Sequence, residues 1–344
     1  MKYALYVTSE QAWKAMLKEV TSAKKSIYIE MYIFLDDTKG FEFFDVLKRK
    51  ASHGVSVKII FDSFGSAALS QKDVSDLKES GIEVLFFSYW FRRTHRKIMI
   101  IDERTAFLGG VNISESFRYW NDLQVKVHGA SARMILRAFA KTYRVCGGTG
   151  AKIIEQYEPP FLKKTKMWIV DHWPMHKKYS LKHAYKEHIL KARKEIKIVT
   201  PYFAPSRWMK ACLHQAVLRG VSVKILVPRS VEYKIFTRIN YYYIGECNKL
   251  GIKVYLLRHM NHAKAILIDN KKGIVGSQNF DVLSFGFNNE ISVCFENKKL
   301  IKFLRNIFDI WIKDAEVFNG QTFKIRWYDY IIAFFIRIFE PMFY

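Results

Sequence analysis

The sequence predicts an α/β protein built from two tandem α/β/α sandwich domains related by a pseudo-twofold duplication. A motif of His, any residue, Lys, four residues and Asp starts at His95 and again at His262. In both copies six residues then separate the Asp from a Gly, which is followed by Gly or Ser, any residue and Asn. The hexapeptide GVSVKI also occurs twice, at 54–59 and 220–225. Repeats of this kind indicate a duplicated domain.

Each half alternates helical and strand-like segments, a pattern typical of a parallel or mixed sheet covered by helices. In the first half we predict helices over residues 12–23 and 41–50, and strands over 26–34 and 55–61. In the second half we predict helices over residues 181–192 and 207–218, and strands over 196–203 and 221–227. The strands that follow the second helices are almost continuously apolar, which predicts cover on both faces.

The repeat also predicts the domain limits. A helix over 130–145 ends at a glycine cluster, as helices commonly do, and a proline-containing stretch follows it. We therefore expect a first domain over 1–150, a connecting segment over 151–178, a second domain over 179–320 and an amphipathic C-terminal helix over 321–344.

Composition limits the class of protein. The 344 residues carry a formal net charge of +24, which favours an anionic partner such as a lipid surface or nucleic acid. The four cysteines lack the spacing of a zinc site or a disulfide framework, which suits a reducing compartment. No apolar run approaches the roughly 18 residues of a membrane span, and the N-terminus lacks a secretory pattern. We expect no transmembrane helix and no signal peptide.

The repeated motif contains the groups that phosphoryl chemistry needs. Residues two apart in a strand face the same way, so each histidine and its lysine should project together. An asparagine amide can donate to a phosphate oxygen, and two ammonium groups can stabilise the charge on a five-coordinate phosphorus. The predicted catalytic residues of the motifs are His95, Lys97, Asn112, His262, Lys264 and Asn279. With two lysines in this role and no metal-ligand spacing elsewhere, we expect no metal and no cofactor.

Two imidazoles can divide the reaction, one attacking phosphorus and the other transferring protons. The sequence alone leaves open which does which. Each needs an orienting partner, and we assign this role to Asp122 and Glu290, ten and eleven residues after the two asparagines. We expect structural roles for the remaining motif residues, Asp102, Asp269, Gly109, Gly110, Gly276 and Ser277.

These residues resemble the phospholipase D superfamily and, within it, the bacterial cardiolipin synthases. The resemblance runs from Leu5 to about Trp311 and includes the segments EMYIFLDD at 30–37, WND at 120–122, TPYFAP at 200–205 and NFD at 279–281. It implies that a phosphatidyl group passes from one phosphatidylglycerol to His95, releasing glycerol, and then to a second phosphatidylglycerol, with His262 as acid and base. The chain departs from the family pattern at Leu283, where arginine is common, and in a short loop before the first histidine.

Aromatic and basic side chains gather in two places that could contact a membrane. One precedes the first histidine and the other is the C-terminal helix, for which docking on the protein is the alternative. The predicted contacts are Trp90, Phe91, Trp327, Phe334 and Phe335. Together with the resemblance they predict a peripheral protein on the cytoplasmic face of the cell membrane, with phosphatidylglycerol and anionic lipid as partners.

Three other functions compete with this reading. A phospholipase D that only hydrolyses, or a nuclease of the same superfamily, would use the same motifs. A nuclease would explain the basic charge but leaves the apolar C-terminus without a role, so we do not expect a nucleic acid partner. A binding module that has lost catalysis is disfavoured because both motif copies are intact. The sequence does not specify an oligomeric state.

Overall fold

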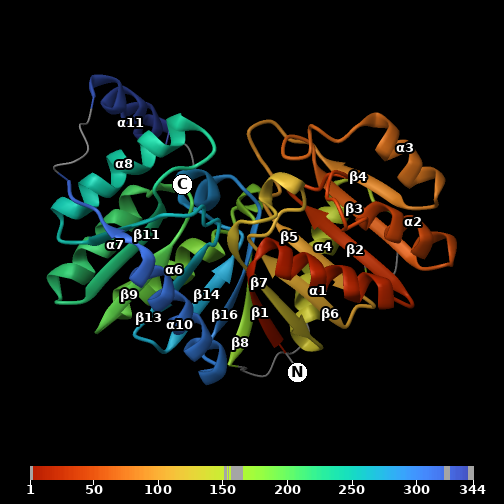
Figure 1. The fold of residues 1–344 in the computed structure, drawn as a ribbon, viewed down its shortest axis with the longest axis horizontal. Coiled ribbons are helices and arrows are strands. Elements are labelled where there is room, and N and C mark those ends of the chain that lie inside the picture. Colours follow the sequence, from red (N-terminus) through yellow and green to blue (C-terminus); the bar gives the residue numbers. More distant parts are fainter. Residues whose placement is uncertain (1–2, 151–152, 154, 156–165, 321–325, 340–344) are drawn as a thin grey trace.

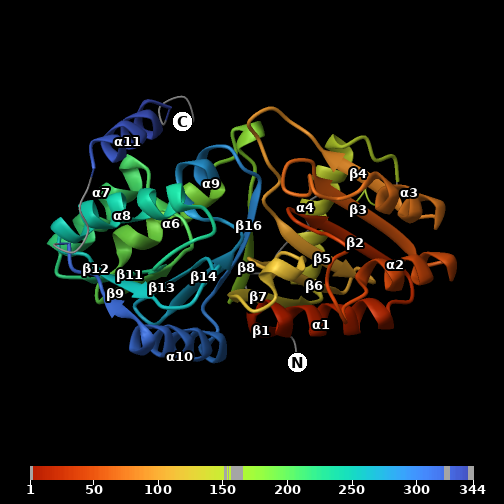
Figure 2. The ribbon, with the colours of Figure 1, turned by 45° about the horizontal axis from the view of Figure 1, so that its top comes forward.

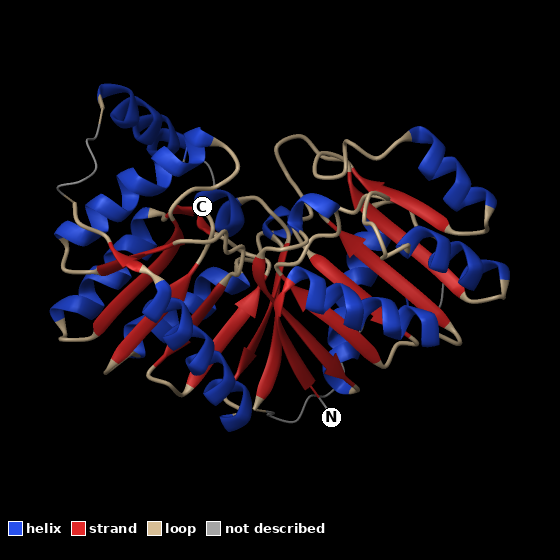
Figure 3. Ribbon diagram, viewed as in Figure 1, coloured by secondary structure: helices blue, strands red, loops and turns tan. Residues whose placement is uncertain are grey.

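The computed structural model describes residues 3–150, 153, 155, 166–320 and 326–339, without the side chains of 335–339. Two halves lie side by side, the first in red to yellow and the second in green to blue (Figure 1). Each half holds a mixed sheet with helices against it (Figure 3).

The first half contains one seven-stranded sheet. Its strands are β1 (Tyr3–Thr8), β2 (Ser26–Met31), β3 (Ser56–Asp62), β4 (Glu83–Phe87), β5 (Lys97–Ile101), β6 (Thr105–Gly109) and β7 (Asn121–His128). Its helices are α1 (Ser9–Ser22), α2 (Phe43–Ser52), α3 (Gln71–Glu79) and α4 (Ala130–Val145). The strand order is β1-β7-β6-β5-β2-β3-β4. Strands β2, β3 and β4 are parallel, and β5, β6, β7 and β1 continue the sheet antiparallel.

The second half repeats this order and adds one short edge strand. Its strands are β8 (Met167–His172), β9 (Glu195–Val199), β11 (Ser222–Pro228), β12 (Lys253–Leu257), β13 (Ala265–Ile268), β14 (Lys272–Gly276), β16 (Glu290–Phe295) and β17 (Glu316–Val317). Its helices are α6 (Ser180–Lys191), α7 (Arg207–Leu218), α8 (Lys234–Lys249) and α10 (Lys298–Asp314). The order β8-β16-β14-β13-β9-β11-β12 matches the first sheet strand for strand, with β17 added at the edge. This confirms the predicted duplicated α/β fold.

Three clusters of buried apolar side chains form the cores. One lies between α1, α2 and α3 and one face of the first sheet, and a second lies between α6, α7 and α8 and one face of the second sheet. The third joins α4 and α10 with the remaining faces of both sheets. The sheets meet where β6 and β7 contact β14 and β16 (Figure 2). The two halves therefore share the third of these clusters, and each has one cluster of its own.

Local signals explain several element limits. Helix α1 begins three residues before the predicted start because the Thr8 side chain accepts a hydrogen bond from the backbone of Gln11, which caps the helix. Strands β2 and β9 end at Met31 and Val199, three and four residues before the predicted ends. The end of the predicted connecting segment forms β8, an edge strand paired with β16.

Two further elements complete the second half. The short strands β10 (Phe203–Ala204) and β15 (Phe280–Asp281) pair in parallel beside α9 (Val282–Gly286). The C-terminal helix α11 (Trp327–Phe339) lies against α8 at the edge of the molecule (Figure 1). No helix within the described residues is long and apolar enough to span a bilayer.

Candidate active site

The two histidine motifs meet where the halves join. Each histidine lies just before its strand, not inside it as predicted, and its backbone N–H bonds the other half. The His95 N–H donates to the Asn289 carbonyl at 3.0 Å, and the His262 N–H donates to the Asn121 carbonyl at 2.7 Å. These contacts belong to two isolated parallel β-bridges between the halves. One pairs Thr94 with Asn289, and the other pairs Asn261 with Asn121. The bridges fix each histidine relative to the residue before the opposite carboxylate.

The two carboxylates contact the imidazoles crosswise. His95 Nδ1 lies 3.0 Å from Glu290 Oε1, and His262 Nδ1 lies 2.9 Å from Asp122 Oδ2. Because an ionised carboxylate only accepts hydrogen bonds, each Nδ1 donates. Each Nε2 then carries the free lone pair of a neutral imidazole. Every histidine and carboxylate pair thus combines one residue from each half.

Burial controls the charge of both imidazoles. His95 and His262 are 7% and 6% exposed. Burial lowers the pKa of His95 to about 4, although Glu290 acts in the opposite direction. Burial, with the nearby Lys264 ammonium, lowers the pKa of His262 to about 3, against the effect of Asp122. Both imidazoles are therefore neutral near pH 7 before an anionic substrate binds.

Both motif lysines are fully buried and near the histidines of both halves. The Nζ of Lys97 donates to the His95 carbonyl at 2.6 Å, and the Nζ of Lys264 donates to the His262 carbonyl. Burial lowers the pKa of Lys97 well below its usual range and that of Lys264 to about 8. Each ammonium also lowers the pKa of the histidine in the opposite half. A phosphate between them would relieve this repulsion.

The two motif asparagines are also buried. Asn112 and Asn279 are 3% and 6% exposed, and the Oδ1 atom of each is buried without a hydrogen-bond partner among the described residues. Each of these amide oxygens can accept a hydrogen bond from a ligand donor. The structure brings together the histidines, lysines and carboxylates predicted to be catalytic, and it buries both asparagines of the same motifs.

Small residues before the asparagines allow the carboxylates to approach. A Cβ on Gly110 would lie 2.2 Å from Asp122 Oδ1, so only glycine fits there. The second half has Ser277 at this position, and its hydroxyl donates to Glu290. A Cβ on Gly109 or on Gly276 would also lie within 2.2 Å of the neighbouring strand.

The aspartates of the two motifs lie away from the histidines. Asp102 and Asp269 start tight turns and have φ values of 50° and 53°. Their carboxylates accept three consecutive backbone N–H groups, from residues 24–26 and 193–195 respectively. Burial opposes their ionisation, but these N–H groups lower the pKa of both. Asp102 thus connects the turn before β2 to the hairpin of β5 and β6, and Asp269 connects the turn before β9 to the hairpin of β13 and β14.

Aromatic rings that the motif analysis did not single out form the walls of the site. The Tyr32 ring stands edge-on to the His95 ring at 4.8 Å, and the Lys97 Nζ lies 4.8 Å from its centre. The Trp120 ring lies 5.6 Å from the His262 ring. Both rings belong to segments quoted above only for their resemblance to a family, which was the one signal available for them.

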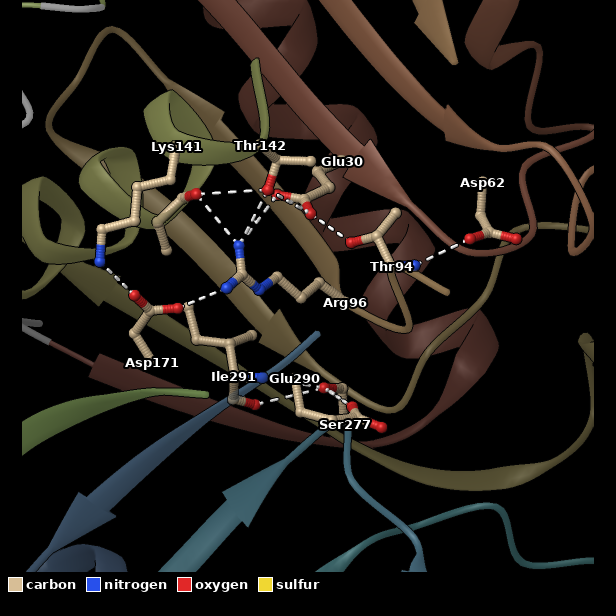
Figure 4. A network of polar contacts seen from close by, with 11 residues as sticks. Glu30, Asp62, Thr94, Arg96, Lys141, Thr142, Asp171, Ser277, Glu290 and Ile291 are labelled. Carbon is tan, nitrogen blue, oxygen red and sulfur yellow. Dashed lines mark hydrogen bonds and ion pairs between the residues drawn. The ribbon is translucent and has the colours of Figure 1, made fainter. Parts of the chain in front are cut away.

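A buried ionic network that sequence reasoning also missed lies behind the first motif (Figure 4). Arg96, between the motif histidine and lysine, is fully buried and pairs with Asp171 of β8 and with Glu30 of β2 at 3.6 Å. The Thr94 hydroxyl donates to Glu30, and the Thr94 N–H donates to Asp62 at 2.8 Å. The second half has Ala263 in place of this arginine. The network therefore holds only the first motif, and it spans both halves.

Within the described residues, no three His, Cys, Asp or Glu side chains are arranged as a metal site. The four cysteines are free, and three are buried.

Comparison with known proteins identifies the family. The family described as "Cardiolipin synthase, PLD-like domain" matches residues 16–142 and again 185–311. The chain belongs to the phospholipase D-type cardiolipin synthases. A "Cardiolipin synthase" of Clostridium perfringens strain 13 is 31% identical over 93% of this chain and 71% of its own length. A "Cardiolipin synthase 2" of Bacillus cereus is 28% identical over 97% of this chain and 69% of its own. The chain is therefore a phospholipase D-type phosphatidyltransferase of phospholipid biosynthesis.

Solved structures agree on the fold. A phosphatidylserine synthase from Haemophilus influenzae matches with a TM-score of 0.78 at 15% identity, over 99% of this chain and 93% of that one. A polyphosphate kinase from Porphyromonas gingivalis matches with a TM-score of 0.66 at 14% identity, over 99% of this chain and 53% of that one.

The residues predicted to contact a membrane are largely exposed. Trp90 and Phe91 are 88% and 74% exposed, and Trp327 and Phe334 are 74% and 59% exposed. The side chain of Phe335 lies outside the described residues. Helix α11 docks on α8 through Asp329, which pairs with Arg238, and through the buried Ala333. The helix thus docks on the protein by one face and presents aromatic side chains on another.

Proposed function

We propose that the chain joins two phosphatidylglycerol molecules into cardiolipin and releases glycerol, through a phosphohistidine on His95. The observation that carries this is the crosswise pair of histidines and carboxylates, because it supplies two oriented neutral imidazoles beside two lysines.

The residues can take the following roles. His95 Nε2 attacks phosphorus while the bond from phosphorus to the glycerol oxygen breaks, and that oxygen takes a proton from His262. The hydroxyl of the second phosphatidylglycerol then gives its proton to His262 as its oxygen attacks phosphorus, and the bond from phosphorus to nitrogen breaks. The incoming phosphodiester raises the pKa of His262 so that it carries the first proton. Lys97 and Lys264 stabilise the charge on phosphorus throughout.

We assign His95 as the nucleophile because a buried ionic network holds its segment and has no counterpart at Ala263 of the second motif. The Thr94 to Arg96 segment is held by the buried network, whereas the second motif has Ala263 and no such network. A nucleophile that forms a covalent bond benefits from a fixed position.

We also propose that the protein works as a peripheral protein on the cytoplasmic face of the membrane. The exposed aromatic side chains before His95 and on α11, with the net charge of +24, suit an anionic lipid surface. Free cysteines suit a reducing compartment.

A lipid product assay tests the proposal. Purified protein is incubated with phosphatidylglycerol vesicles, and the products are separated by mass, with His95→Ala as the matched variant. Cardiolipin and glycerol in equal amounts, lost in the variant, is the expected result. Phosphatidic acid as the sole product would mean a hydrolase, and activity on plasmid DNA without any lipid product would mean a nuclease.

A further inference from the structure

A solvent-accessible polar pair beside the site has no role in the chemistry above. The Tyr202 hydroxyl donates a hydrogen bond to Glu232 Oε2 at 3.1 Å. Tyr202 follows β9 and Glu232 follows β11, so both lie beyond the carboxyl ends of neighbouring parallel strands, where α/β proteins commonly bind ligands. Unlike the buried imidazoles, both side chains reach solvent.

The position of Tyr202 is fixed to the second catalytic segment. The Thr200 hydroxyl donates to the Tyr202 carbonyl at 2.8 Å and accepts from the Phe280 N–H at 3.2 Å. Phe280 directly follows Asn279, so one hydroxyl connects the tyrosine to the asparagine segment. The Tyr202 ring also packs edge-on against Phe236 at 5.4 Å.

Glu232 is close to reacting groups of both halves. Burial lowers the pKa of Lys264, and Glu232 is among the carboxylates that oppose this. Burial raises the pKa of Tyr32, and Glu232 contributes in the same direction. Tyr32 stands edge-on to His95. Glu232 is therefore within electrostatic range of Lys264 in its own half and of Tyr32 in the other half.

A carboxylate here is unexpected for a site that binds phosphate, because it repels a phosphodiester. The nearby carboxylates of Asp62 and Asp281 accept backbone N–H groups, which explains them structurally. Glu232 instead accepts from a side-chain hydroxyl. An ionised carboxylate can accept about four hydrogen bonds, so Glu232 can accept more from hydroxyl groups of a ligand.

We propose that Glu232 and Tyr202 form the subsite for the alcohol, and that they select a polyol over monohydric alcohols and water. This rests on the proposed function, in which a glycerol group leaves and another glycerol group enters. Because both displacements at phosphorus are in line with the same nitrogen of His95, the leaving and the entering alcohol occupy the same place. One subsite therefore serves both steps.

A competition assay tests the proposal. The donor is a short-chain phosphatidyl-p-nitrophenol. Its leaving group is p-nitrophenol and not glycerol, so release of p-nitrophenol reports the first step alone. Glycerol and 1-propanol, which share a three-carbon chain, are added at equal concentration as acceptors. The ratio of phosphatidylglycerol to phosphatidylpropanol is measured by mass for the wild type, Glu232→Gln and Tyr202→Phe. Glu79→Gln, on α3 at the far edge of the first half (Figure 1), is the matched control.

We expect the ratio to fall about tenfold or more in Glu232→Gln, because a hydrogen bond to a charged group is lost, and less in Tyr202→Phe. The control should keep the ratio of the wild type. General damage to the fold would lower both products together and leave the ratio unchanged. If the wild type makes both alcohol products and Glu232→Gln keeps the same ratio between them, the subsite proposal is wrong and the proposed function stands. A wild type that makes phosphatidic acid and neither alcohol product would overturn the proposed function as well.

Discussion

At the scale of residues, the decisive feature is that each imidazole is oriented by a carboxylate of the other half. The repeated spacing predicts the two histidines and two lysines that the structure places together, because the chemistry requires those residue types twice. It does not specify the partners, since His95 and Glu290 are 195 positions apart and meet only through the bridge formed by Asn289. The buried Arg96 and Tyr32 were also not predicted, because one arginine or tyrosine in a strand-like segment carries no spacing signal.

We predict a bell-shaped pH dependence of kcat/KM for the free enzyme. As the pH falls through about 4, His95 takes up a proton and ceases to be a nucleophile. As the pH rises through about 8, Lys264 loses the charge that stabilises the phosphate. The measurement is p-nitrophenol release from phosphatidyl-p-nitrophenol between pH 3 and pH 10, over the range where the circular dichroism spectrum is constant. An acid limb near 6.5, the ordinary value for imidazole, would contradict the burial of His95.

At the scale of elements, the sequence predicts the helices and strands with strong periodicity and misses those defined by pairing. Strand β8 lies in a stretch with prolines and was assigned to the connection, yet it pairs with β16 along its whole length. Asp171 of this strand is the ion-pair partner of Arg96. An edge strand of this kind is specified by its neighbour, because strand preference depends on context more than helix preference does.

Removal of the arginine should destabilise the protein strongly. Arg96→Met leaves Glu30 buried without a cationic partner and leaves Asp171 with Lys141 alone, which costs about 3–5 kcal/mol of unfolding free energy. Urea unfolding followed by circular dichroism measures this. The control is Lys191→Met, which removes an exposed pair on α6 and should cost less than about 1 kcal/mol. Equal shifts of the two midpoints would show that the network does not stabilise the join between β5 and β8.

Helix α11 should contribute to membrane binding through its exposed face. Trp327→Ala with Phe334→Ala removes two large apolar side chains, and burial of each in lipid is worth about 1.5–3 kcal/mol. We expect at least about tenfold weaker sedimentation with anionic vesicles. Ile310→Ala changes an equally exposed side chain on α10, on the opposite side of the molecule (Figure 1), and should have no effect. Unchanged binding of the double variant would assign α11 to protein contacts alone.

At the scale of the whole molecule, duplication produces one site from two halves of a single chain. The family and the fold were predictable because the repeats cover most of the chain. The shared core between α4, α10 and both sheets was not, since it requires knowing which faces of the sheets meet. The crosswise bridges and this core make each half incomplete without the other.

A complementation test follows from this organisation. The His95→Ala and His262→Ala variants are mixed, or unfolded and refolded together. The mixture should have no activity, because each chain forms its own site and that site lacks one histidine in both variants. Activity of the wild type should be proportional to protein concentration. Recovery of about a quarter of wild-type activity in the refolded mixture would show instead that sites form between chains.

The most direct test of the account asks which step each carboxylate supports. The measurement is the burst and the steady rate of p-nitrophenol release from phosphatidyl-p-nitrophenol, together with the mass of the trapped protein, for Glu290→Gln and Asp122→Asn. Glu290 contacts His95, the proposed nucleophile, so Glu290→Gln should slow the burst by at least about a hundredfold. Asp122 orients His262, which this leaving group does not need, so Asp122→Asn should keep the burst, slow the steady rate and accumulate a phosphatidyl adduct on His95. The opposite pattern, or an adduct on His262, would contradict the crosswise assignment.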